Sequence, residues 1–285
     1  MPPNDPKNAL DHLILFLPAD PATNLPKVPS FISDNFTLTP GGTHADGLTS
    51  NTLLLLPDGA YIELISFLPS AAPSSLSTHW WSHHATTPGW ADWCLTNALA
   101  PSTFHPLVQA THSEPRHGGR KRADGVDVKW AVTFPRGPRG KTPFFCHDVT
   151  PREVRVPLGE ARTTHPSGVV GVVSLTVMVD SSAALDATRA AYATLLTDLA
   201  HADTTHSCFG TQRVVPVPEL SEGAKVKLVL PRDDADREKV RERGFWYGDV
   251  VLAAPAREGK PAGTKERLDG GGGGEDLQGL WIAYV

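Results

Sequence analysis

Short apolar runs separated by proline- and glycine-rich turns recur along the chain and predict a protein rich in strands. Residues 10–17 are nearly all apolar and predict a buried strand. A short helix is expected at 31–35, and the runs 52–56 and 61–67, joined by Pro-Asp-Gly, predict a hairpin. With residues 36–39 as a further strand, this part of the chain follows the order β-α-β-β-β.

A second unit of the same kind is expected over residues 92–148. Its strands are predicted at 92–96, 126–134 and 144–148, and its short helix at 101–110. The pattern of the first unit recurs more faintly, with one strand fewer. An internal repeat of this length indicates that the chain is built from small modules rather than from one large core.

A third unit is expected to begin with the β-branched strand 169–179. The clearest amphipathic helix of the chain follows it, with Ser181 or Ser182 as the N-cap. Residues 232–243 are charged and predict a surface helix, and the glycine-rich stretch 255–275 predicts a flexible connector. Further strands are predicted at 212–217, 225–230, 249–253 and 280–285.

Composition and charge limit the class of protein. With 285 residues, 40% of them hydrophobic and 20% charged, the chain has ordinary globular composition and enough length for two packed domains. Its formal net charge of -5 argues against binding to a nucleic acid, which requires clustered Lys and Arg. The one basic cluster, 116–122, contains two glycines and is interpreted as a solvated hairpin tip.

Cysteine usage and the length of the apolar runs favour a cytoplasmic protein. Cys94, Cys146 and Cys208 are widely spaced and odd in number, which argues against a disulfide framework and favours a reducing compartment. Residues 1–7 are polar and proline-rich, and no apolar run of signal-peptide form follows them. No apolar stretch approaches the roughly 20 residues that span a bilayer, so no membrane partner is expected.

Three segments of the chain carry a family resemblance. They are Leu-Asp-His-Leu-Ile-Leu at 10–15, Pro-Gly-Gly-Thr-His at 40–44 and Asp-Gly-Ala-Tyr-Ile-Glu-Leu-Ile at 58–65. Together they resemble the glyoxalase-like domain of the vicinal-oxygen-chelate superfamily. The resemblance is clearest over residues 9–67 and weaker beyond them, and the segment from residue 165 resembles an appended unit of the same design.

The resemblance implies an α+β fold in which βαβββ modules pair and curl into a mixed sheet around a cup. It divides the chain into paired modules at 1–155 and a third unit at 156–285, which includes the glycine-rich loop 255–275. Three modules leave one unpaired, so either the rest of its own chain or a second subunit in a homodimer must cover it. The superfamily contains lyases, isomerases, dioxygenases and antibiotic-binding proteins, so the fold alone does not define a reaction.

His12 and Glu63 lie in the middle of two predicted apolar strands, where a carboxylate is costly to bury without a partner. From the residues alone, a His–Glu hydrogen bond inside the core explains them as well as a metal does. The resemblance favours a metal, because metal-dependent members hold a divalent ion with residues on the first and last strand of each module. Asp92 and His147 match these places in the second module. The predicted ligands of a Zn, Mn, Fe or Ni ion are therefore His12, Glu63, Asp92 and His147.

The register of the second-module strands decides whether Asp92 and His147 reach the cup. A shift of one residue turns either side chain to the other face of the sheet. The alternatives are that Asp92 caps a strand end and that His147 lies in a solvated turn.

Other residues are predicted to form the wall of the cup. His44 and Asn51 lie in one polar loop, where His44, like Glu63, is predicted to move a proton and Asn51 to contact substrate. Trp81, from a segment rich in His and Trp, and Phe145, from the closing strand of the second module, are also predicted to bind substrate. A surface position for His44 and simple packing of Trp81 against the sheet are the alternatives.

Three functions are compatible with these residues. The first is a metal-dependent lyase, isomerase or dioxygenase that acts on a small oxygen-rich or hydrophobic molecule. The second is a protein that sequesters such a molecule without a metal. The third is a metal-free enzyme in which His12 and Glu63 form an acid–base pair. Metal content separates the first function from the others, and turnover separates the third from the second.

Overall fold

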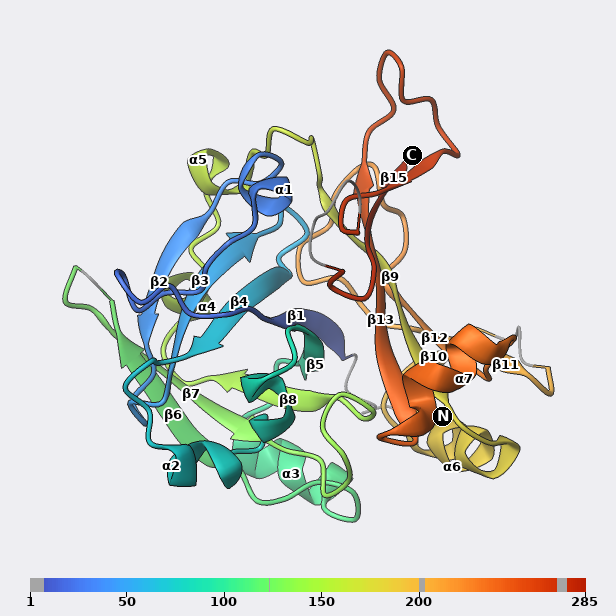
Figure 1. Cartoon of the computed structure of the whole chain (residues 1–285), viewed down its shortest axis with the longest axis horizontal. Helices are drawn as coiled ribbons and strands as arrows, with labels where there is room; N and C mark the ends of the chain where they lie inside the picture. Colours follow the sequence, from blue (N-terminus) through green and yellow to red (C-terminus); the bar gives the residue numbers. More distant parts are fainter. Residues whose placement is uncertain (1–7, 123, 200–202, 271–275) are drawn as a thin grey trace.

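Two twisted sheets lie side by side in the computed structural model (Figure 1). The structure describes residues 8–122, 124–199, 203–270 and 276–285. Residues 1–7 and most of the predicted glycine run, 271–275, lie outside the described part. Eight strands from the first half of the chain form one sheet, and seven strands from the second half form the other.

The first sheet is a pair of four-stranded units. Its strand order is β2-β3-β4-β1-β5-β8-β7-β6, and the two units meet where β1 and β5 pair antiparallel. In each unit the last strand runs parallel beside the first, β4 beside β1 and β8 beside β5. The predicted α+β fold of paired βαβββ modules is thereby confirmed. The elements are β1 (Ala9–Phe16), α1 (Ser30–Ser33), β2 (Thr39–Thr43), β3 (Thr49–Leu55), β4 (Tyr61–Phe67), α2 (Pro73–Ser77), the 3₁₀ helix η1 (Ser82–Ala85), β5 (Gly89–Thr96), α3 (Pro101–Val108), β6 (Arg116–Lys121), β7 (Asp127–Thr133), β8 (Phe144–Asp148), α4 (Arg152–Arg155) and α5 (Glu160–Thr163).

The second sheet repeats this plan. Its order is β10-β11-β12-β9-β13-β15-β14, in which β9 and β13 take the central places that β1 and β5 hold in the first sheet. Ser181, one of the two predicted caps, accepts a hydrogen bond from the Ala184 amide and starts α6. The elements are β9 (Gly171–Val179), α6 (Ser182–Ala193), β10 (Thr197–Asp198), β11 (His206–Gly210), β12 (Lys225–Val229), α7 (Asp234–Arg241), β13 (Phe245–Ala254), β14 (Lys265–Arg267) and β15 (Leu280–Tyr284).

The second sheet therefore holds two units where the sequence predicts one. The fourth unit escaped detection because no helix follows β13 in the described residues and because its strand β14 is only three residues long. The two units pair with each other through β9 and β13. The unpaired module that gave a reason to expect a homodimer is thus covered within the chain, and the homodimer itself stays a prediction.

Two polar edge strands were not predicted from the sequence. Strands β2 and β6 have the sequences Thr-Pro-Gly-Gly-Thr and Arg-His-Gly-Gly-Arg-Lys, which lack apolar alternation. The predicted strand 212–217 is wrong, since these residues contribute only a bridge between Gln212 and Ala9 and another at Val217. The basic cluster read as a hairpin tip is in fact strand β6, paired with β7 along its whole length.

Strand β1 separates two different environments. Leu13 and Leu15 point into the main core, which lies between the two sheets and includes Val177 and Tyr247 of the second. Ile14, on the other face of β1, belongs to a smaller apolar cluster on the concave side of the first sheet. Alternation along the strand therefore sends one set of side chains to the core and the other to the concave side.

The first sheet curls until its two edge strands almost meet. The Ala45 amide, just after β2, donates to the Gly119 carbonyl of β6 at 3.3 Å. Arg120 of β6 donates from Nη1 to the Gly41 carbonyl of β2, also at 3.3 Å. The concave face is thus enclosed as a cup (Figure 1). No helix in the described part of the chain is long and apolar enough to cross a membrane.

One carboxylate ties the two sheets together. Asp58, in the turn between β3 and β4, accepts hydrogen bonds from the Val172 amide at 2.9 Å and from Arg213 Nη1 at 2.5 Å. Both partners belong to the second half of the chain. Asp58 is 2% exposed, so this connection is made inside the molecule.

Candidate active site

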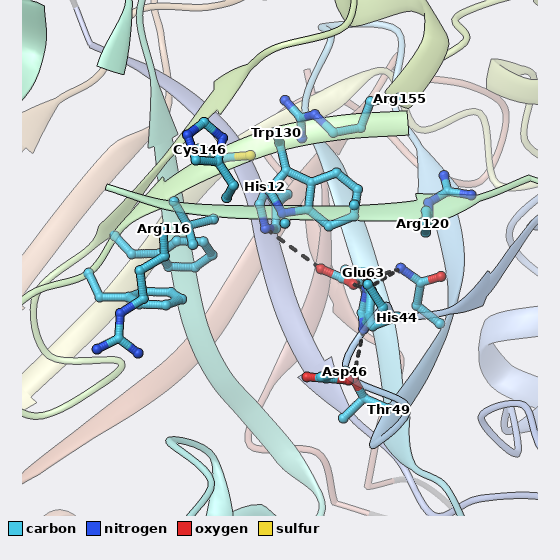
Figure 2. Close-up of a pocket in the computed structure, with 18 of the residues that line it drawn as sticks. His12, His44, Asp46, Thr49, Glu63, Arg116, Arg120, Trp130, Cys146 and Arg155 are labelled. Atoms are coloured by element: carbon cyan, nitrogen blue, oxygen red, sulfur yellow. Dashed lines mark hydrogen bonds and ion pairs between the residues drawn. The ribbon is translucent and has the colours of Figure 1, made fainter. Parts of the chain in front are cut away.

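The cup of the first sheet contains a cavity of about 290 Å³ (Figure 2). This volume suits a small organic molecule. Both units contribute to its wall: β1, β3 and β4 from the first, and β6, β7 and β8 from the second. Much of the wall is aromatic, and the rings are those of Tyr61, Trp80, Trp81, Trp130, Phe134 and Phe144.

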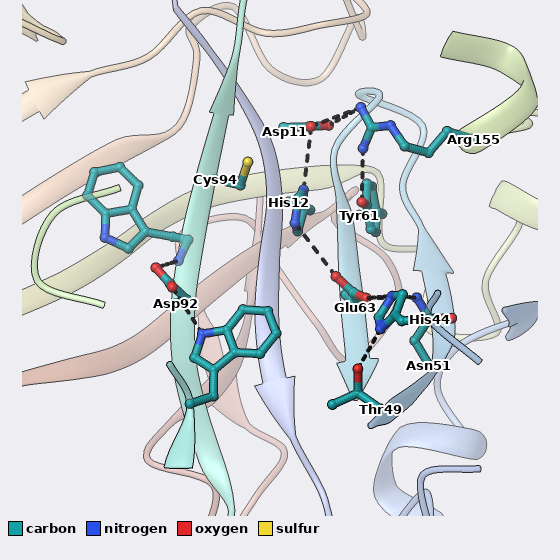
Figure 3. Close-up of polar contacts among 12 residues, drawn as sticks. Asp11, His12, His44, Thr49, Asn51, Tyr61, Glu63, Asp92, Cys94 and Arg155 are labelled. Atoms are coloured by element: carbon teal, nitrogen blue, oxygen red, sulfur yellow. Dashed lines mark hydrogen bonds and ion pairs between the residues drawn. The ribbon is translucent and has the colours of Figure 1, made fainter. Parts of the chain in front are cut away.

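Glu63 lies at the centre of the polar part of the cup (Figures 2 and 3). Its Oε1 accepts a hydrogen bond from Asn51 Nδ2 at 2.7 Å and lies 3.3 Å from His44 Nε2. Its Oε2 lies 3.7 Å from His12 Nε2. Burial acts to raise the pKa of Glu63, but the hydrogen bond and charge of His44, the charge of His12 and the Asn51 amide together lower this pKa to about 2. Glu63 is therefore a carboxylate at neutral pH.

The β2–β3 hairpin positions the partners of Glu63. His44 begins the turn, where its amide donates to the Thr49 carbonyl at 2.9 Å and its Nδ1 lies 2.6 Å from Thr49 Oγ1. Gly47 has φ +69°, which favours glycine in this tight turn. Asn51 Oδ1 accepts from the Gly42 amide at 3.0 Å, which leaves the Asn51 amide group to face Glu63. The hairpin thus fixes both groups that hold Oε1.

His12 is packed between aromatic rings at the base of the cup. Its ring stacks on Tyr61 with centroids 4.6 Å apart and meets the edge of Phe144 at 5.3 Å. Its Nδ1 is 3.5 Å from Asp11 Oδ2 and has no hydrogen-bond partner among the described residues. The side chain is held mainly by ring packing, with its Nε2 toward Glu63 (Figure 3).

A balanced group of four charges lies behind His12. Asp11 pairs with Arg152 at 2.8 Å and with Arg155 at 2.9 Å, and Arg155 also pairs with Asp148 at 2.6 Å. Burial acts to raise the pKa of Asp11, but the two guanidinium groups hold it well below its ordinary value. Arg155 additionally donates to the Tyr61 hydroxyl at 3.0 Å. Two cations and two anions thus compensate one another beneath the cup.

The residues present fit a resident metal ion only in part. Within the described residues, one group of three His, Cys, Asp or Glu side chains brings its donor atoms together: Asp11, His12 and Cys94. Asp11 is already engaged by two arginines, and burial raises the pKa of the Cys94 thiol well above its ordinary value. At the cup itself, His12 and Glu63 supply two donors, fewer than the three protein ligands of a typical catalytic zinc site.

The prediction that Asp92 is a metal ligand is wrong. Its Oδ2 accepts from Arg139 Nε at 2.6 Å and from Trp81 Nε1 at 3.1 Å, and the residue is 0% exposed. Cys94, not Asp92, is the residue of β5 that pairs with His12. Asp92 pairs with Ile14, in unbroken register with the His12–Cys94 pair, but Arg139 and Trp81 occupy its carboxylate, so it serves as the buried partner of Arg139.

His147 and Phe145 were predicted to face the cup, but each lies one residue away from a position on strand β8 that does. Phe144 and Cys146 face the cup, whereas Phe145 and His147 point to the opposite face of β8. There both rings pack on Phe104, with centroids 4.5 Å and 5.1 Å away. Because side chains alternate along a strand, this single step exchanges the two faces.

The structure gathers the remaining predicted residues at the cup. His12, His44, Asn51, Glu63 and Trp81 all line the cavity. Their roles in catalysis or binding stay predictions.

Three cavity-lining cations were missed in the sequence, namely Arg116, Arg120 and Arg155. The first two belong to the basic cluster, and their even spacing places them on one face of a strand. That spacing was the signal that could have identified them.

Comparison with known proteins agrees with this fold. The family model described as glyoxalase-like domain matches residues 10–196, and the chain therefore belongs to that family. A hypothetical protein from Staphylococcus aureus has a similar structure, with a TM-score of 0.67 at 12% identity over 98% of this chain and 99% of that one. No curated protein matches the sequence.

Two further solved structures share the fold. A mutant of 4-hydroxymandelate synthase from Streptomyces coelicolor has a TM-score of 0.50 at 15% identity, covering 90% of this chain and 73% of that one. A xylose isomerase-like TIM barrel/4-hydroxyphenylpyruvate dioxygenase fusion protein has a TM-score of 0.53 at 12% identity, over 91% of this chain and 38% of that one. At these identities the likeness establishes the fold and not the reaction.

Proposed function

We propose that the protein is an enzyme of the lyase or isomerase kind, which moves a proton on a small carbonyl compound with Glu63 as the base. One observation carries the proposal. Glu63 is a buried carboxylate at the cup whose Oε1 is held by Asn51 and His44, while its Oε2 accepts no hydrogen bond from the described residues. A fixed carboxylate with one free oxygen, facing an aromatic cavity, is the arrangement that carbon-to-oxygen proton transfer requires.

Substrate binding would adjust the strength of this base. A carboxylate with a pKa of about 2 is a weak base in the free site. A bound molecule displaces water from the cup, and desolvation of the carboxylate raises its pKa toward the range useful for catalysis. Glu63 Oε2 would then take a proton from the carbon beside the carbonyl group and return it to the same or a neighbouring carbon.

His12, on the strand beside Glu63, is placed to assist. In the tautomer that carries a proton on Nε2, it donates to the carbonyl oxygen, on which negative charge develops as Glu63 removes the proton. Its Nε2 lies 3.7 Å from Glu63 Oε2, beyond hydrogen-bond length, so the two groups are free to contact the same bound molecule. The packing on Tyr61 holds the imidazole in this orientation.

A metal-assisted reaction is the second candidate. The distance between His12 Nε2 and Glu63 Oε2 is compatible with it. Bonds of about 2.1 Å from an ion to a histidine nitrogen and to a carboxylate oxygen are compatible with donors 3.7 Å apart. A divalent ion there would supply Lewis-acid polarisation of a substrate oxygen. The membership of the chain in the glyoxalase-like family supports this candidate. Simple sequestration of a ligand, without turnover, is the remaining alternative.

Deuterium exchange tests the proposal directly. The purified protein, treated with a chelator, is incubated in deuterium oxide with a panel of small aldehydes, ketones and oxo acids, and proton NMR follows exchange beside the carbonyl group. Exchange is expected with the wild type and not with Glu63→Gln. The control is Glu160→Gln, which changes an exposed glutamate of α5. Equal exchange by the Glu63 variant, or none by the wild type across the panel, would reject the proposal.

A further inference from the structure

Arg120 is a buried cation without an acidic partner in the described part of the chain. It is 9% exposed, and its hydrogen bond goes to a neutral acceptor, the Gly41 carbonyl, at 3.3 Å. Two other arginines near the first sheet are neutralised: the partly buried Arg139 pairs with Asp92, and the buried Arg155 with Asp11. A guanidinium has five N–H donors, so most of the hydrogen-bonding capacity of Arg120 is unused.

Arg120 lies in the wall of the cavity, where a ligand in the cup would contact it, and it also borders a second hollow beside β2. It lines the cavity from β6, on the same strand face as Arg116 (Figure 2). Burial lowers the pKa of the Arg120 guanidinium by more than the nearby Tyr61 and Glu63 raise it, so these two residues compensate its charge only in part. An uncompensated buried charge is costly to keep, and an anion from outside the chain would remove that cost.

We infer that Arg120 binds a carboxylate of the substrate, so that the natural ligand is a small carboxylic acid with an apolar or aromatic portion. The guanidinium matches a carboxylate in a bidentate manner. Glu63 repels a second carboxylate, which directs the anionic end of the ligand toward Arg120 and leaves the neutral end near Glu63. The assignment of that neutral end as the reacting part rests on the proposed function, whereas the binding of the carboxylate does not.

The surroundings of Arg120 agree with such a ligand. Trp130, Phe134 and Phe144 line the cavity and provide apolar faces for its uncharged portion. Arg116 is exposed at the same wall and adds positive potential there, which attracts anions from solution. The cavity of about 290 Å³ limits the ligand to a small acid.

Three probes of similar shape test the inference in the full-length protein. They are phenylacetate, the neutral phenylacetamide and benzylphosphonate, and binding is measured by calorimetry and by the fluorescence of the tryptophans in the cup. The wild type is expected to bind phenylacetate about tenfold or more tightly than phenylacetamide, as a charge-assisted hydrogen-bond pair provides. Arg120→Gln is expected to remove this difference without weakening the binding of the amide. The unchanged amide affinity also shows that the variant is folded.

Two further variants make the test specific. Lys121→Gln changes an exposed cation next to Arg120, and this control is expected to keep the full preference for the carboxylate. Arg120→Lys is expected to keep part of it, since the charge remains and the bidentate geometry is lost. The inference is overturned if Arg120→Gln keeps the preference, if Arg116→Gln alone removes it, if benzylphosphonate binds more tightly than phenylacetate, or if no carboxylate binds at millimolar concentration.

Failure of this inference is distinguishable from failure of the proposed function. Glu63→Gln removes the base and leaves Arg120 in place, so it is expected to keep the carboxylate preference. If the wild type prefers phenylacetate over phenylacetamide but shows no deuterium exchange, only the role of Glu63 as a base is rejected. Deuterium exchange that depends on Glu63, without any preference that depends on Arg120, would reject only the role of Arg120.

Discussion

His12 Nε2 and Glu63 Oε2 face each other at 3.7 Å across two neighbouring parallel strands. The strands β1 and β4 come from the two ends of one module, so pairing within that module creates the site. The pair is too far apart for a hydrogen bond and is not neutralised by the charge group beneath it, where Asp11 and Arg155 bind each other. The predictions below follow from this arrangement and from the residues that support it.

Replacement of Glu63 by Gln is expected to lower turnover by about 10²–10⁴-fold, the range typical of a lost general base. The amide keeps the size of the side chain, so substrate affinity should change little. Stopped-flow or NMR assays that separate kcat from KM measure the two effects. A variant with an unchanged kcat and a raised KM would instead assign Glu63 to binding.

The stability of the protein is expected to depend on Glu63 in acid. Its pKa falls from 4.5 to about 2 on folding. Between these two pH values the carboxyl group is protonated in the unfolded state and ionised in the folded state. The stabilisation is complete above pH 4.5 and is lost as the pH falls toward about 2. Urea unfolding across this range should show a steeper loss of stability in the wild type than in Glu63→Gln. Parallel curves would contradict the lowered pKa.

Removal of divalent ions separates the two candidate reactions. If Glu63 acts without a metal, dialysis against a chelator is expected to leave deuterium exchange unchanged. Elemental analysis of tag-free protein, beside a His12→Ala, Glu63→Ala double variant, gives the metal content of the same samples. Loss of exchange on chelation, with recovery on adding Zn, Mn, Fe or Ni, would favour the metal-assisted reaction.

Asp92 is expected to act in stability rather than in chemistry. Asp92→Asn leaves Arg139 buried with its charge uncompensated, and breaking a buried pair in this way costs about 3–5 kcal/mol. Urea denaturation measures the change. Asp124→Asn, which alters an exposed aspartate paired with Arg122, is the control and should change stability far less than Asp92→Asn. A small effect of Asp92→Asn would show that Arg139 does not depend on its partner.

Gly41→Ala is expected to disturb the site without touching a catalytic group. A Cβ at Gly41 would overlap the side-chain oxygen and the carbonyl of Asn51, and Asn51 holds Glu63 Oε1. Turnover should therefore fall together with stability. Gly137→Ala is the control, since its Cβ would meet no atom within 4 Å. Equal behaviour of the two variants would mean that the β2–β3 hairpin moves freely.

The strands that consist of continuous apolar segments could be predicted from the sequence. Strands β4 and β8 were predicted with their observed limits, and the family resemblance placed His12 and Glu63 in the cup that they line. In β8, by contrast, Phe144 and Phe145 are both apolar, and the polar His147 is itself buried on the face away from the cup, so polarity does not mark which face lines the cup. The choice of face was therefore open, and the predicted one was wrong.

Long-range partners explain the remaining errors. Asp92 was predicted to be a metal ligand because its neighbours in the sequence include no cation to pair with it. Its partner, Arg139, lies 47 residues further along the chain. Arg120 resembles a solvent-exposed charge because its strand is rich in glycine, and only the curl of the sheet encloses it. Each error concerns a charged residue whose environment is created by distant parts of the chain.

The connection made by Asp58 has a consequence for cooperativity. Because its carboxylate binds Val172 and Arg213, separating the two sheets would leave a buried anion and a cation without partners. Partial unfolding of either half is thereby penalised, so the chain should melt in a single transition. A protease cut in the connection between α5 and β9 would for the same reason leave two fragments that stay associated and keep the cup intact.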